Sequence, residues 1–430
     1  MDRPRVAILD GLRTPQCKSG GPLRFVPADD LGAIVVKELL ARTGIDPEQV
    51  SELIFGNVGQ PAHAANIARV VALKAGLPRS MVCHTVHHNC ASGIQSVTTA
   101  AMHIQAGRAD LVIAGGTESM SQIPLLVSAP MTALFLKLLK ARSPGARLRA
   151  LLGFRPSHLK PIVALQLGLT DPVCGLNMGE TAEVLAREFG ISRREQDEFA
   201  LASHEKAVSA AESGRFEEEI IAVIGPPAWD HAQTADDGPR PEQSMEALAK
   251  LRPYFDRQAG TVTAGNSCPI TDGAAGLVLA SELKAKELGV EPLGYVGDWA
   301  YAALDGRRMG LGPVYATARP LQQTGRSMSD FDVVELNEAF AVQVIANQRA
   351  FASASFAREH LGLSDAVGEL DPGRLNVNGG AIALGHPVGA TGTRLLLTVL
   401  RELRRRGERW GLATLCVGGG QGAAVTVEAA

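Results

Sequence analysis

Apolar runs that suit buried strands alternate with helix-like segments along the first part of the chain. Residues 6–9, 52–56 and 111–114 form short apolar runs of strand length. Residues 28–43 instead place apolar side chains at helical spacing, and a second helical pattern ends at Gly107, a residue that suits a helix C-terminus. This alternation predicts an α/β architecture with a parallel sheet.

The last third of the chain repeats this layout. The run 331–336 resembles the run 50–55, and each precedes an asparagine within a few residues. Residues 389–392, Gly-Ala-Thr-Gly, stand where residues 90–93, Cys-Ala-Ser-Gly, stand in the first half. A helix and a strand are then expected at 393–406 and 411–416. The pattern predicts a duplicated α/β unit, and chance similarity between two strand–helix–strand units is the alternative.

A different pattern fills the stretch between the two halves. From Ser119 to Leu169 the chain has no acidic residue, while basic residues alternate with Leu and Phe: Lys137, Lys140, Arg142, Arg147, Arg149, Arg155 and Lys160. Such a segment can rest on an anionic membrane, dock a partner subunit or receive a phosphate-bearing ligand. An ordinary solvated helix hairpin with a buried leucine face is equally compatible. Further on, residues 234–241 have the composition of an exposed linker.

Composition narrows the class of protein. A chain of 430 residues, 46% of them hydrophobic, is long enough for two or three domains with their own cores. A net charge of −3 and an aromatic content of 4% argue against a nucleic-acid-binding protein. The sequence has no pattern of a signal peptide or membrane span, so a cytoplasmic location is expected.

The six cysteines are too few for the disulfide framework of a secreted domain, and free thiols are expected. The segment 83–90 holds two cysteines and three histidines, which raises the question of a zinc site. Adjacent ligands such as His87 and His88 rarely converge on one ion, and no second ligand pair completes the set. A metal site is therefore not expected.

Two cysteines and a histidine in glycine-rich turns indicate carbonyl chemistry. Cys90 precedes a predicted helix, whose free N–H groups and positive dipole end favour a thiolate and can hold an oxyanion. His386 lies in an irregular Gly-His-Pro turn, and Cys416 precedes glycines whose backbone can approach a ligand closely. Asn337 ends a predicted buried strand, where ligands gather in open α/β sheets. Each residue also has a purely structural interpretation, as a buried thiol, a carbonyl cap or part of a tight turn.

Seven motifs, in order along the chain, resemble those of the thiolases, acyltransferases that cleave or form 3-ketoacyl-CoA. They are NCASG at 89–93, AGGTESMS at 114–121, NMGETAE at 177–183, TVTAGNS at 261–267, NEAFA at 337–341, GHP at 385–387 and CVGGG at 416–420. The resemblance covers nearly the whole chain. It implies a thiolase fold, with two similar α/β/α halves in a layered αβαβα arrangement and an inserted loop domain. The expected N-terminal half is 1–120 with 250–290, the insertion is 121–249 and the C-terminal half is 291–430.

The resemblance also implies roles for the residues in these turns. Cys90 takes the acyl group, His386 activates it, and Cys416 moves a proton on and off the carbon of acetyl-CoA. The family builds one oxyanion site from the histidine and a water held by the motif asparagine, here His386 and Asn337. The other uses backbone N–H groups, here those of Cys90 and Gly418.

CoA contacts are implied by family position at Arg240, Ala264, Ser267, Cys268 and Phe340. Cys268 stands where a serine or threonine is expected, which is a departure from the family pattern. CoA is the carrier and a substrate, so the resemblance implies no permanently bound cofactor.

The basic, leucine-rich insertion resembles that of the β subunit of fatty-acid β-oxidation complexes. This implies thiolytic cleavage of 3-ketoacyl-CoA, a homodimer or dimer of dimers, a hydratase/dehydrogenase partner subunit and peripheral membrane contact through 123–170. A short-chain, acetoacetyl-CoA-forming acetyltransferase is one alternative. A condensing ketoacyl synthase is another, although it would pair its cysteine with two histidines. A non-catalytic lipid-binding or scaffold protein on the same fold is the alternative of a different class.

Overall fold

The computed structural model of the protein describes residues 4–430 and divides into two compact units. The larger unit consists of the chain up to Gln122 and from Asp171 onward, and the smaller unit is Ile123–Thr170. The stretch 171–249, which the predicted insertion includes, belongs to the larger unit. Residues 1–3 of the predicted N-terminal half lie outside the described residues.

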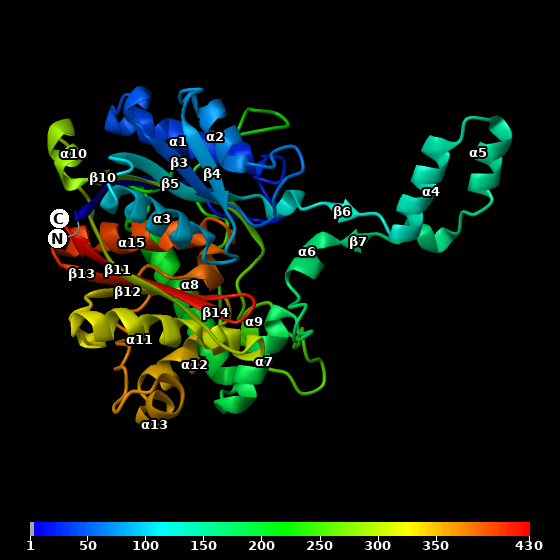
Figure 1. Cartoon of the computed structure of the whole chain (residues 1–430). Coiled ribbons are helices and arrows are strands. Elements are labelled where there is room, and N and C mark those ends of the chain that lie inside the picture. The colour runs from blue at the N-terminus through cyan, green and yellow to red at the C-terminus, as the bar shows by residue number, and fades with distance from the viewer. Residues whose placement is uncertain (1–3) are drawn as a thin grey trace. The chain divides into compact units, whose positions relative to one another are not determined.

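A ten-stranded sheet runs through the larger unit in the order β12-β13-β14-β11-β1-β10-β5-β3-β4, with β2 paired to β10 (Figure 1). Its strands are β1 Val6–Arg13, β2 Cys17–Lys18, β3 Glu52–Gly56, β4 Val82–Val86, β5 Leu111–Glu118, β10 Thr271–Ser281, β11 Gly294–Ala303, β12 Val333–Leu336, β13 Trp410–Val417 and β14 Gln421–Ala429. A separate short pair joins β8 Val223–Ile224 to β9 Ala232–Gln233. The two halves of the sheet meet where β1 pairs with β11.

Helices form three layers around the two halves of the sheet (Figure 1). The outer layer on the first half is α1 Ala28–Thr43 and α2 Ile67–Ala75, the central layer is α3 Ser92–Gln105 and α15 Thr391–Arg406, and the outer layer on the second half is α11 Gly312–Thr324 and α12 Ala341–Phe351. The central core contains leucines of α15, apolar residues of α3 and inward side chains from both halves of the sheet. This is the predicted αβαβα layering.

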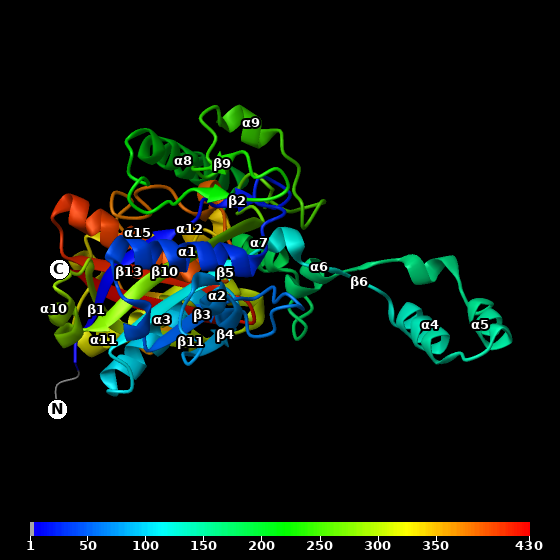
Figure 2. The same cartoon turned by 90° about the horizontal axis from the view of Figure 1, so that it is seen from above.

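The other helices of the larger unit are α7 Met178–Glu188, α8 Arg193–Glu212, α9 Met245–Ala249, α10 Glu282–Leu288, α13 Ala354–Phe356 and α14 Ala381–Leu384. Short 3₁₀ turns lie at Pro47–Gln49, Met120–Gln122, Gly306–Leu311 and Met328–Asp330, and a π turn at Ala357–Leu361. Figure 2 shows α8, β9 and α9 along one side of the layers. Helices α7 and α8 each begin with a reciprocal capping box, Asn177 with Glu180 and Ser192 with Glu195.

The predicted elements are confirmed, but the sheet is mixed rather than parallel. The helix 28–43 and the strand 52–56 have the predicted bounds. Strand β3 is parallel to β4 and β5, and β12 is parallel to β13. Strand β10 enters between β1 and β5 antiparallel to both, and β14 returns from β13 through a glycine hairpin, which requires antiparallel pairing.

Helices α3 and α15 come together at a glycine crossing, which we define as Gly93 and Gly392. A Cβ on Gly93 would lie 2.7 Å from the backbone nitrogen of Thr393, and a Cβ on Gly392 would lie 2.5 Å from that of Ile94. The Thr393 hydroxyl donates a hydrogen bond of 3.1 Å to the Gly93 carbonyl. The two helices therefore touch backbone to backbone, and the matching positions of the two glycines support the duplication that the sequence predicts.

The segment 234–241 is irregular and exposed at both ends, as predicted, but its middle is bound to the rest of the larger unit. The Asp236 carboxylate accepts two hydrogen bonds from the Arg13 guanidinium, at 2.7 and 2.9 Å, and its side chain is only 3% exposed. The neighbouring Asp237 accepts from the Lys18 backbone N–H at 2.8 Å. Arg13 is itself buried and also pairs with Glu219, so Asp236 of this loop and Glu219 together neutralise an internal cation.

The smaller unit is a helix hairpin. It contains α4 Ala129–Lys140, α5 Pro144–Leu151, a 3₁₀ turn at Pro156–Leu159, α6 Ala164–Gly168 and a pairing of β6 Leu125–Leu126 with β7 Ile162–Val163. The Ser128 and Ser143 hydroxyls cap α4 and α5. Leucines such as Leu139 and Leu152 are about four-fifths exposed, at 82% and 79%. In the described residues, none of the helices combines the length and the hydropathy that crossing a bilayer requires.

The glycine crossing predicts a test of stability. Gly392→Ala should lower the free energy of unfolding by about 1–3 kcal/mol, because the new methyl group meets backbone atoms that cannot rotate away. Denaturant unfolding followed by circular dichroism measures this change. Gly145→Ala, in α5 with open space around the new Cβ, is the matched control and should not destabilise the protein. Equal stability of the Gly392→Ala protein and the wild type would contradict the close contact.

Candidate active site

Cys90 lies in a tight turn immediately before α3, as the sequence predicts. The turn requires a left-handed backbone at Asn89, with φ of +45°. Hydrogen bonds from the Ala91 N–H to the His88 carbonyl and from the Ser92 N–H to the Asn89 carbonyl, both of 3.0 Å, close it. Helix α3 has no side-chain cap at its N-terminus, and the positive end of its dipole lies next to Cys90, where it favours a negative charge.

The Cys90 turn contacts the hairpin between β13 and β14. The Asn89 side-chain amide donates to the Gly418 carbonyl at 2.8 Å. Burial raises the pKa of the Cys90 thiol, while hydrogen bonds from the backbone N–H groups of Gly418 and of Cys90 itself act to lower it. Burial outweighs these hydrogen bonds, so the thiol stays protonated until a base removes its proton.

Three thiols share this region, since Cys268 and Cys416 join Cys90. Cys416 is the last residue but one of β13, opposite Gly422, and it is fully buried. Burial raises the pKa of Cys268 to about 12, with Cys90 adding to the effect. Burial also raises the pKa of Cys416 well above its usual value, with Cys90 and Cys268 adding to it. Thiolates this close repel one another, so deprotonation of one opposes deprotonation of the next.

His386 is held by hydrogen bonds in its Gly-His-Pro turn. Its backbone N–H donates to the Thr271 hydroxyl at 3.1 Å, and its Nδ1 lies 2.6 Å from the Thr391 hydroxyl. Because the Thr391 hydroxyl donates its hydrogen to the Pro387 carbonyl, it accepts from Nδ1–H. Nε2 is then the unprotonated nitrogen, and it is buried with no hydrogen-bond partner in residues 4–430.

The charge state of His386 follows from its surroundings. Burial lowers its pKa to about 4, and the nearby Arg394 guanidinium lowers it further. The imidazole is therefore neutral at pH 7 and presents a lone pair on Nε2. Such a group can take a proton from a thiol and then donate it to an oxyanion.

Asn337 follows β12 and is buried. Its backbone N–H donates to the Thr414 carbonyl at 3.0 Å, but the nitrogen and the oxygen of its side-chain amide both lack partners in the described part of the chain. Buried amide groups are rarely left without hydrogen bonds. This amide is therefore suited to hold a water or a polar ligand group.

Two buried carboxylates hold these loops in place, and the sequence prediction missed both. Glu118 accepts hydrogen bonds from the backbone N–H groups of Val58, Gly59 and Gly389, which joins the two halves, and burial raises its pKa to about 7. Glu338 accepts from Asn376 and from other groups of the loop that leads to His386. The sequence feature that could have identified both glutamates is their position within the motifs AGGTESMS and NEAFA.

Of the residues predicted to contact CoA, Ser267, Cys268 and Phe340 lie together, whereas Arg240 lies on another loop. Ser267 pairs with Phe340 in a short bridge, and the Cys268 N–H donates to the Ala339 carbonyl at 3.0 Å. The Ser267 hydroxyl is already used by the Thr263 carbonyl, at 2.7 Å.

The Phe340 ring packs edge to face on Phe255, with centroids 6.0 Å apart. Ala264 lies exposed in the turn that precedes Ser267. Arg240 is exposed on another loop near His204, whose pKa burial lowers to about 4 with Arg240 contributing. Among the described residues, no hydrogen bond joins Arg240 to the other four predicted residues. Within residues 4–430 no group of three or more His, Cys, Asp or Glu is arranged to hold a metal ion.

Comparisons with known proteins give one consistent family over nearly the whole chain. The family model for the thiolase N-terminal domain matches residues 6–283, and that for the thiolase C-terminal domain matches residues 290–429. The chain is 45% identical over 425 residues to a 3-ketoacyl-CoA thiolase of Yersinia enterocolitica, covering 99% of this chain and 97% of the relative. It is 44% identical over 425 residues to one of Pectobacterium atrosepticum, covering 99% and 96%.

Solved structures give the same result. The Bacillus anthracis acetyl-CoA acetyltransferase is similar with a TM-score of 0.87 and 36% identity, covering 100% of this chain and 99% of that one. A human mitochondrial 3-ketoacyl-CoA thiolase in complex with CoA is similar with a TM-score of 0.85 and 35% identity, covering 99% and 98%.

The state of His386 can be tested directly. Because its pKa in the folded protein is about 4, below the usual 6.5, ¹⁵N NMR should show Nδ1–H and bare Nε2 with no titration between pH 8 and pH 5. The stability that this neutral burial contributes is complete above pH 6.5 and is lost as the pH falls toward 4.

Thr391→Val removes the hydroxyl that accepts from Nδ1 and should mix the two tautomers, whereas Thr391→Ser should preserve the single tautomer. The imidazole signals that are absent from the spectrum of the His386→Gln protein are those of His386. A titration of His386 centred near 6.5 would contradict the buried, neutral state.

Proposed function

Because the chain belongs to the thiolase family, as its motifs predict, and is therefore an acyltransferase, we propose that it cleaves 3-ketoacyl-CoA. The products are acetyl-CoA and an acyl-CoA shortened by two carbons, and the reaction also runs in reverse as a Claisen condensation. The names and the extent of the bacterial relatives support this substrate class. The geometry that supports it best is the cluster of Cys90, Cys268 and Cys416 beside the Gly418 backbone.

In the first step Nε2 of His386 takes the proton of the Cys90 thiol, and the thiolate attacks the 3-keto carbon. The N–H groups of Cys90 and Gly418 stabilise the oxyanion that forms. The bond between C2 and C3 then breaks, its electron pair moves into the enolate of acetyl-CoA, and the acyl group stays on Cys90 as a thioester. Protonated His386 and a water on Asn337 hold the enolate oxygen, while Cys416 donates a proton to C2.

In the second step the Cys416 thiolate takes the proton of an incoming CoA thiol. The CoA thiolate attacks the thioester on Cys90 and releases the shortened acyl-CoA, and Cys90 leaves as a thiolate that regains its proton from His386. The high pKa of Cys416 suits this role, because a thiol of high pKa gives a thiolate that is a strong base. The two steps together restore the starting protonation states.

CoA binding is proposed at Ala264, Ser267, Cys268 and Phe340, with Arg240 in reach of a more distant part of the ligand. The backbone pairing of Ser267 with Phe340 and of Cys268 with Ala339 supports a common surface for the first four. A thiol at 268 is a weaker hydrogen-bond donor than a hydroxyl, so this contact is weaker than in a chain with serine or threonine there.

The acyl intermediate provides the decisive test. Incubation with a 3-ketoacyl-CoA, followed by digestion and mass spectrometry, should place a thioester on Cys90 and on no other cysteine. Cys416→Ser should still acylate Cys90 but lose exchange of the acetyl-CoA methyl protons with D₂O, by about 10²-fold or more. Cys174→Ser, at a thiol outside the cluster, is the matched control and should behave as the wild type.

The absence of an adduct on Cys90 would reject the covalent mechanism. Unimpaired proton exchange in the Cys416→Ser protein would reject its acid/base role while leaving the acylation of Cys90 intact.

Assembly is a further part of the proposal. In the described residues β4 pairs only with β3, so its other edge is available to another chain, which supports a homodimer or a dimer of dimers. The resemblance to β-oxidation complexes supports a hydratase/dehydrogenase partner subunit.

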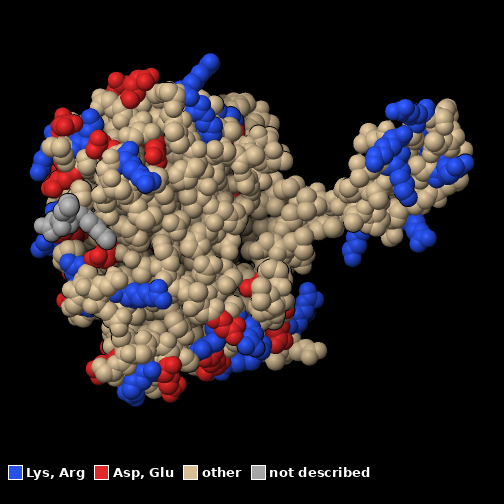
Figure 3. Space-filling model, in the orientation of Figure 1, with Lys and Arg blue, Asp and Glu red and all other residues tan. Residues whose placement is uncertain are grey.

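For the smaller unit, 123–170, we propose contact with an anionic membrane surface. Its charged residues are all basic, and its helices carry exposed leucines such as Leu139, Leu148 and Leu152. In Figure 3 the visible face of this unit has Lys and Arg and no Asp or Glu. Basic groups next to exposed apolar side chains favour peripheral binding to anionic lipid.

Liposome flotation tests this contact. Replacing five basic residues with Gln should remove most binding to anionic vesicles, since each contributes about 1 kcal/mol near such a surface; they are Lys137, Lys140, Arg142, Arg147 and Arg149. The matched control replaces five exposed basic residues of the larger unit, Lys37, Arg79, Arg108, Lys286 and Arg358, and should leave binding unchanged. Equal flotation of the first variant and the wild type would reject membrane contact through this unit.

A further inference from the structure

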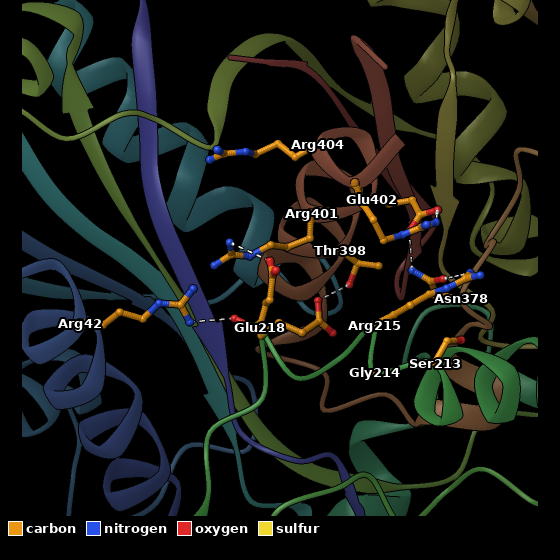
Figure 4. Close-up of a pocket in the computed structure, with 12 residues that line it drawn as sticks. Arg42, Ser213, Gly214, Arg215, Glu218, Asn378, Thr398, Arg401, Glu402 and Arg404 are labelled. Atoms are coloured by element: carbon orange, nitrogen blue, oxygen red, sulfur yellow. Dashed lines mark hydrogen bonds and ion pairs between the residues drawn. The ribbon is translucent and has the colours of Figure 1, made fainter. Parts of the chain in front are cut away.

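A basic cavity of about 620 Å³ lies beside the second half of α15, away from the candidate active site. Its walls come from α15, from the loop 213–219 after α8, from Arg42 of α1 and from Asn378 (Figure 4). Thr391, which orients His386, is the first residue of α15, and Arg401 follows ten residues later. Along a helix this separation is about 15 Å, so the cavity and the candidate catalytic residues are distinct sites.

Arginine dominates the lining of this cavity. Five arginines face it, Arg42, Arg215, Arg401, Arg404 and Arg405, together with three glutamates, Glu218, Glu219 and Glu402. Two of these carboxylates are already paired, one with an arginine outside the lining and the other with Arg405 of the lining and with Arg406. Glu219 pairs with the buried Arg13 at 2.7 Å, and Glu402 binds both Arg405 and Arg406. The positive charge of the cavity therefore exceeds the negative charge that is free to balance it.

The hydrogen bonds of the arginines show where that excess lies. Arg215 has no carboxylate within ion-pair distance in residues 4–430, and its Nη1 donates to the Asn378 side-chain oxygen at 2.9 Å. The carboxylate nearest to Arg404 is that of Glu291, at 3.8 Å, and this glutamate is 80% exposed. Figure 4 shows Arg404 extended from α15 without a bond to the other residues drawn.

Arg401 lies deeper in the cavity, with a side chain that is 13% exposed. It pairs with Asp10 at 2.6 Å and more loosely with Glu218 at 3.4 Å, while its Nε is buried without a partner in the described residues. Burial lowers its pKa, and the neighbouring Arg42 opposes the effect of Asp10. A partly desolvated cation in this state gains from an added anion.

We propose that this cavity binds a small polyanion that carries two or more phosphate or carboxylate groups. Guanidinium groups present paired N–H donors in the geometry that both groups accept. Arg215 and Arg404 provide donors that no carboxylate of the described chain occupies closely, and Arg401 adds charge behind them. The volume lies within the range of small-molecule sites. This site goes beyond the proposed thiolase reaction, which does not use it.

The cavity is also connected to the loop that carries His386. Asn378 accepts from Arg215 and donates to Glu402 at 3.1 Å. An anion that binds Arg215 thus contacts a residue that holds this loop.

Calorimetric titration of the full-length protein with pyrophosphate, and separately with citrate, tests the site. Saturable binding of either probe at one site per chain is expected, and it should persist in saturating CoA. The double variant Arg215→Gln/Arg404→Gln should weaken it by roughly tenfold or more. These arginines hold no buried carboxylate, and the single variant Arg404→Gln, at an exposed residue, should weaken binding in the same direction. Arg108→Gln/Arg358→Gln removes the same charge elsewhere on the surface and should have no effect.

The pair of probes distinguishes a phosphate site from a carboxylate site. Failure of both to bind at up to about 10 mM would overturn the proposal. Complete competition by CoA, or equal affinity in the double variant and the wild type, would place the anion elsewhere and would overturn it as well.

Discussion

The backbone contact between α3 and α15 is the constraint on which the rest of the site depends. Cys90 lies just before α3, and Thr391, which accepts from His386, is the first residue of α15. Gly93 and Gly392 let the two helices meet with no side chain between them, so the two turns are brought together from opposite halves of the chain. The Glu118 carboxylate reinforces this arrangement, because it binds backbone N–H groups of the first half and the Gly389 N–H of the second. Neither half could form the site alone.

Burial then decides the charge state of each group at that contact. It raises the pKa of the Cys90, Cys268 and Cys416 thiols and lowers that of His386, so every one of these groups is neutral at pH 7. None of these four groups is therefore charged before the reaction begins. In the proposed reaction a proton moves from Cys90 to His386 before charge moves to carbon, and Cys416 stays protonated until the enolate needs its proton. The mutual repulsion of thiolates imposes the same order, since two of them in one buried space are costly.

The sequence predicts the parts of the molecule that rest on local pattern. Helix α1 is a long segment with apolar residues at helical spacing and strand β3 is a short apolar run, while the turns of Cys90 and Cys416 are marked by their glycines. Strand β10 was missed because Gly273, Ala274, Ala275 and Gly276 favour no strand locally. The fold selects these small residues, since a Cβ on Gly276 would lie 2.9 Å from Val35 of α1. The prediction of a parallel sheet was wrong in part for the same reason, because this unmarked strand pairs antiparallel with β1 and β5, and the pairings of β11 and β14 are antiparallel as well.

The sequence also could not predict which side chains form hydrogen bonds or ion pairs with one another. The bond from His386 to Thr391 lies within an irregular loop that no periodicity describes, and the pairing of Asp236 with Arg13 spans more than two hundred residues. The family resemblance predicts which residues matter but does not say what holds them. The role of Glu118 and Glu338 in holding the loops becomes clear only from the backbone N–H groups that they bind in the structure.

Two basic regions of this chain differ in how they can recognise an anion. The lysines and arginines of 123–170 are solvated and have no acidic neighbour in their own unit, so their effect is a sum of charges without a fixed geometry. In the cavity beside α15, Asp10, Asn378 and Glu402 hold Arg401, Arg215 and Arg405 in place and fix the directions of their N–H groups, while Arg404 is exposed at the rim. Salt screens exposed charges over about 8 Å at physiological ionic strength and buried charges much less. The first region therefore responds to the charge density of a surface, and the second selects an anion by its shape.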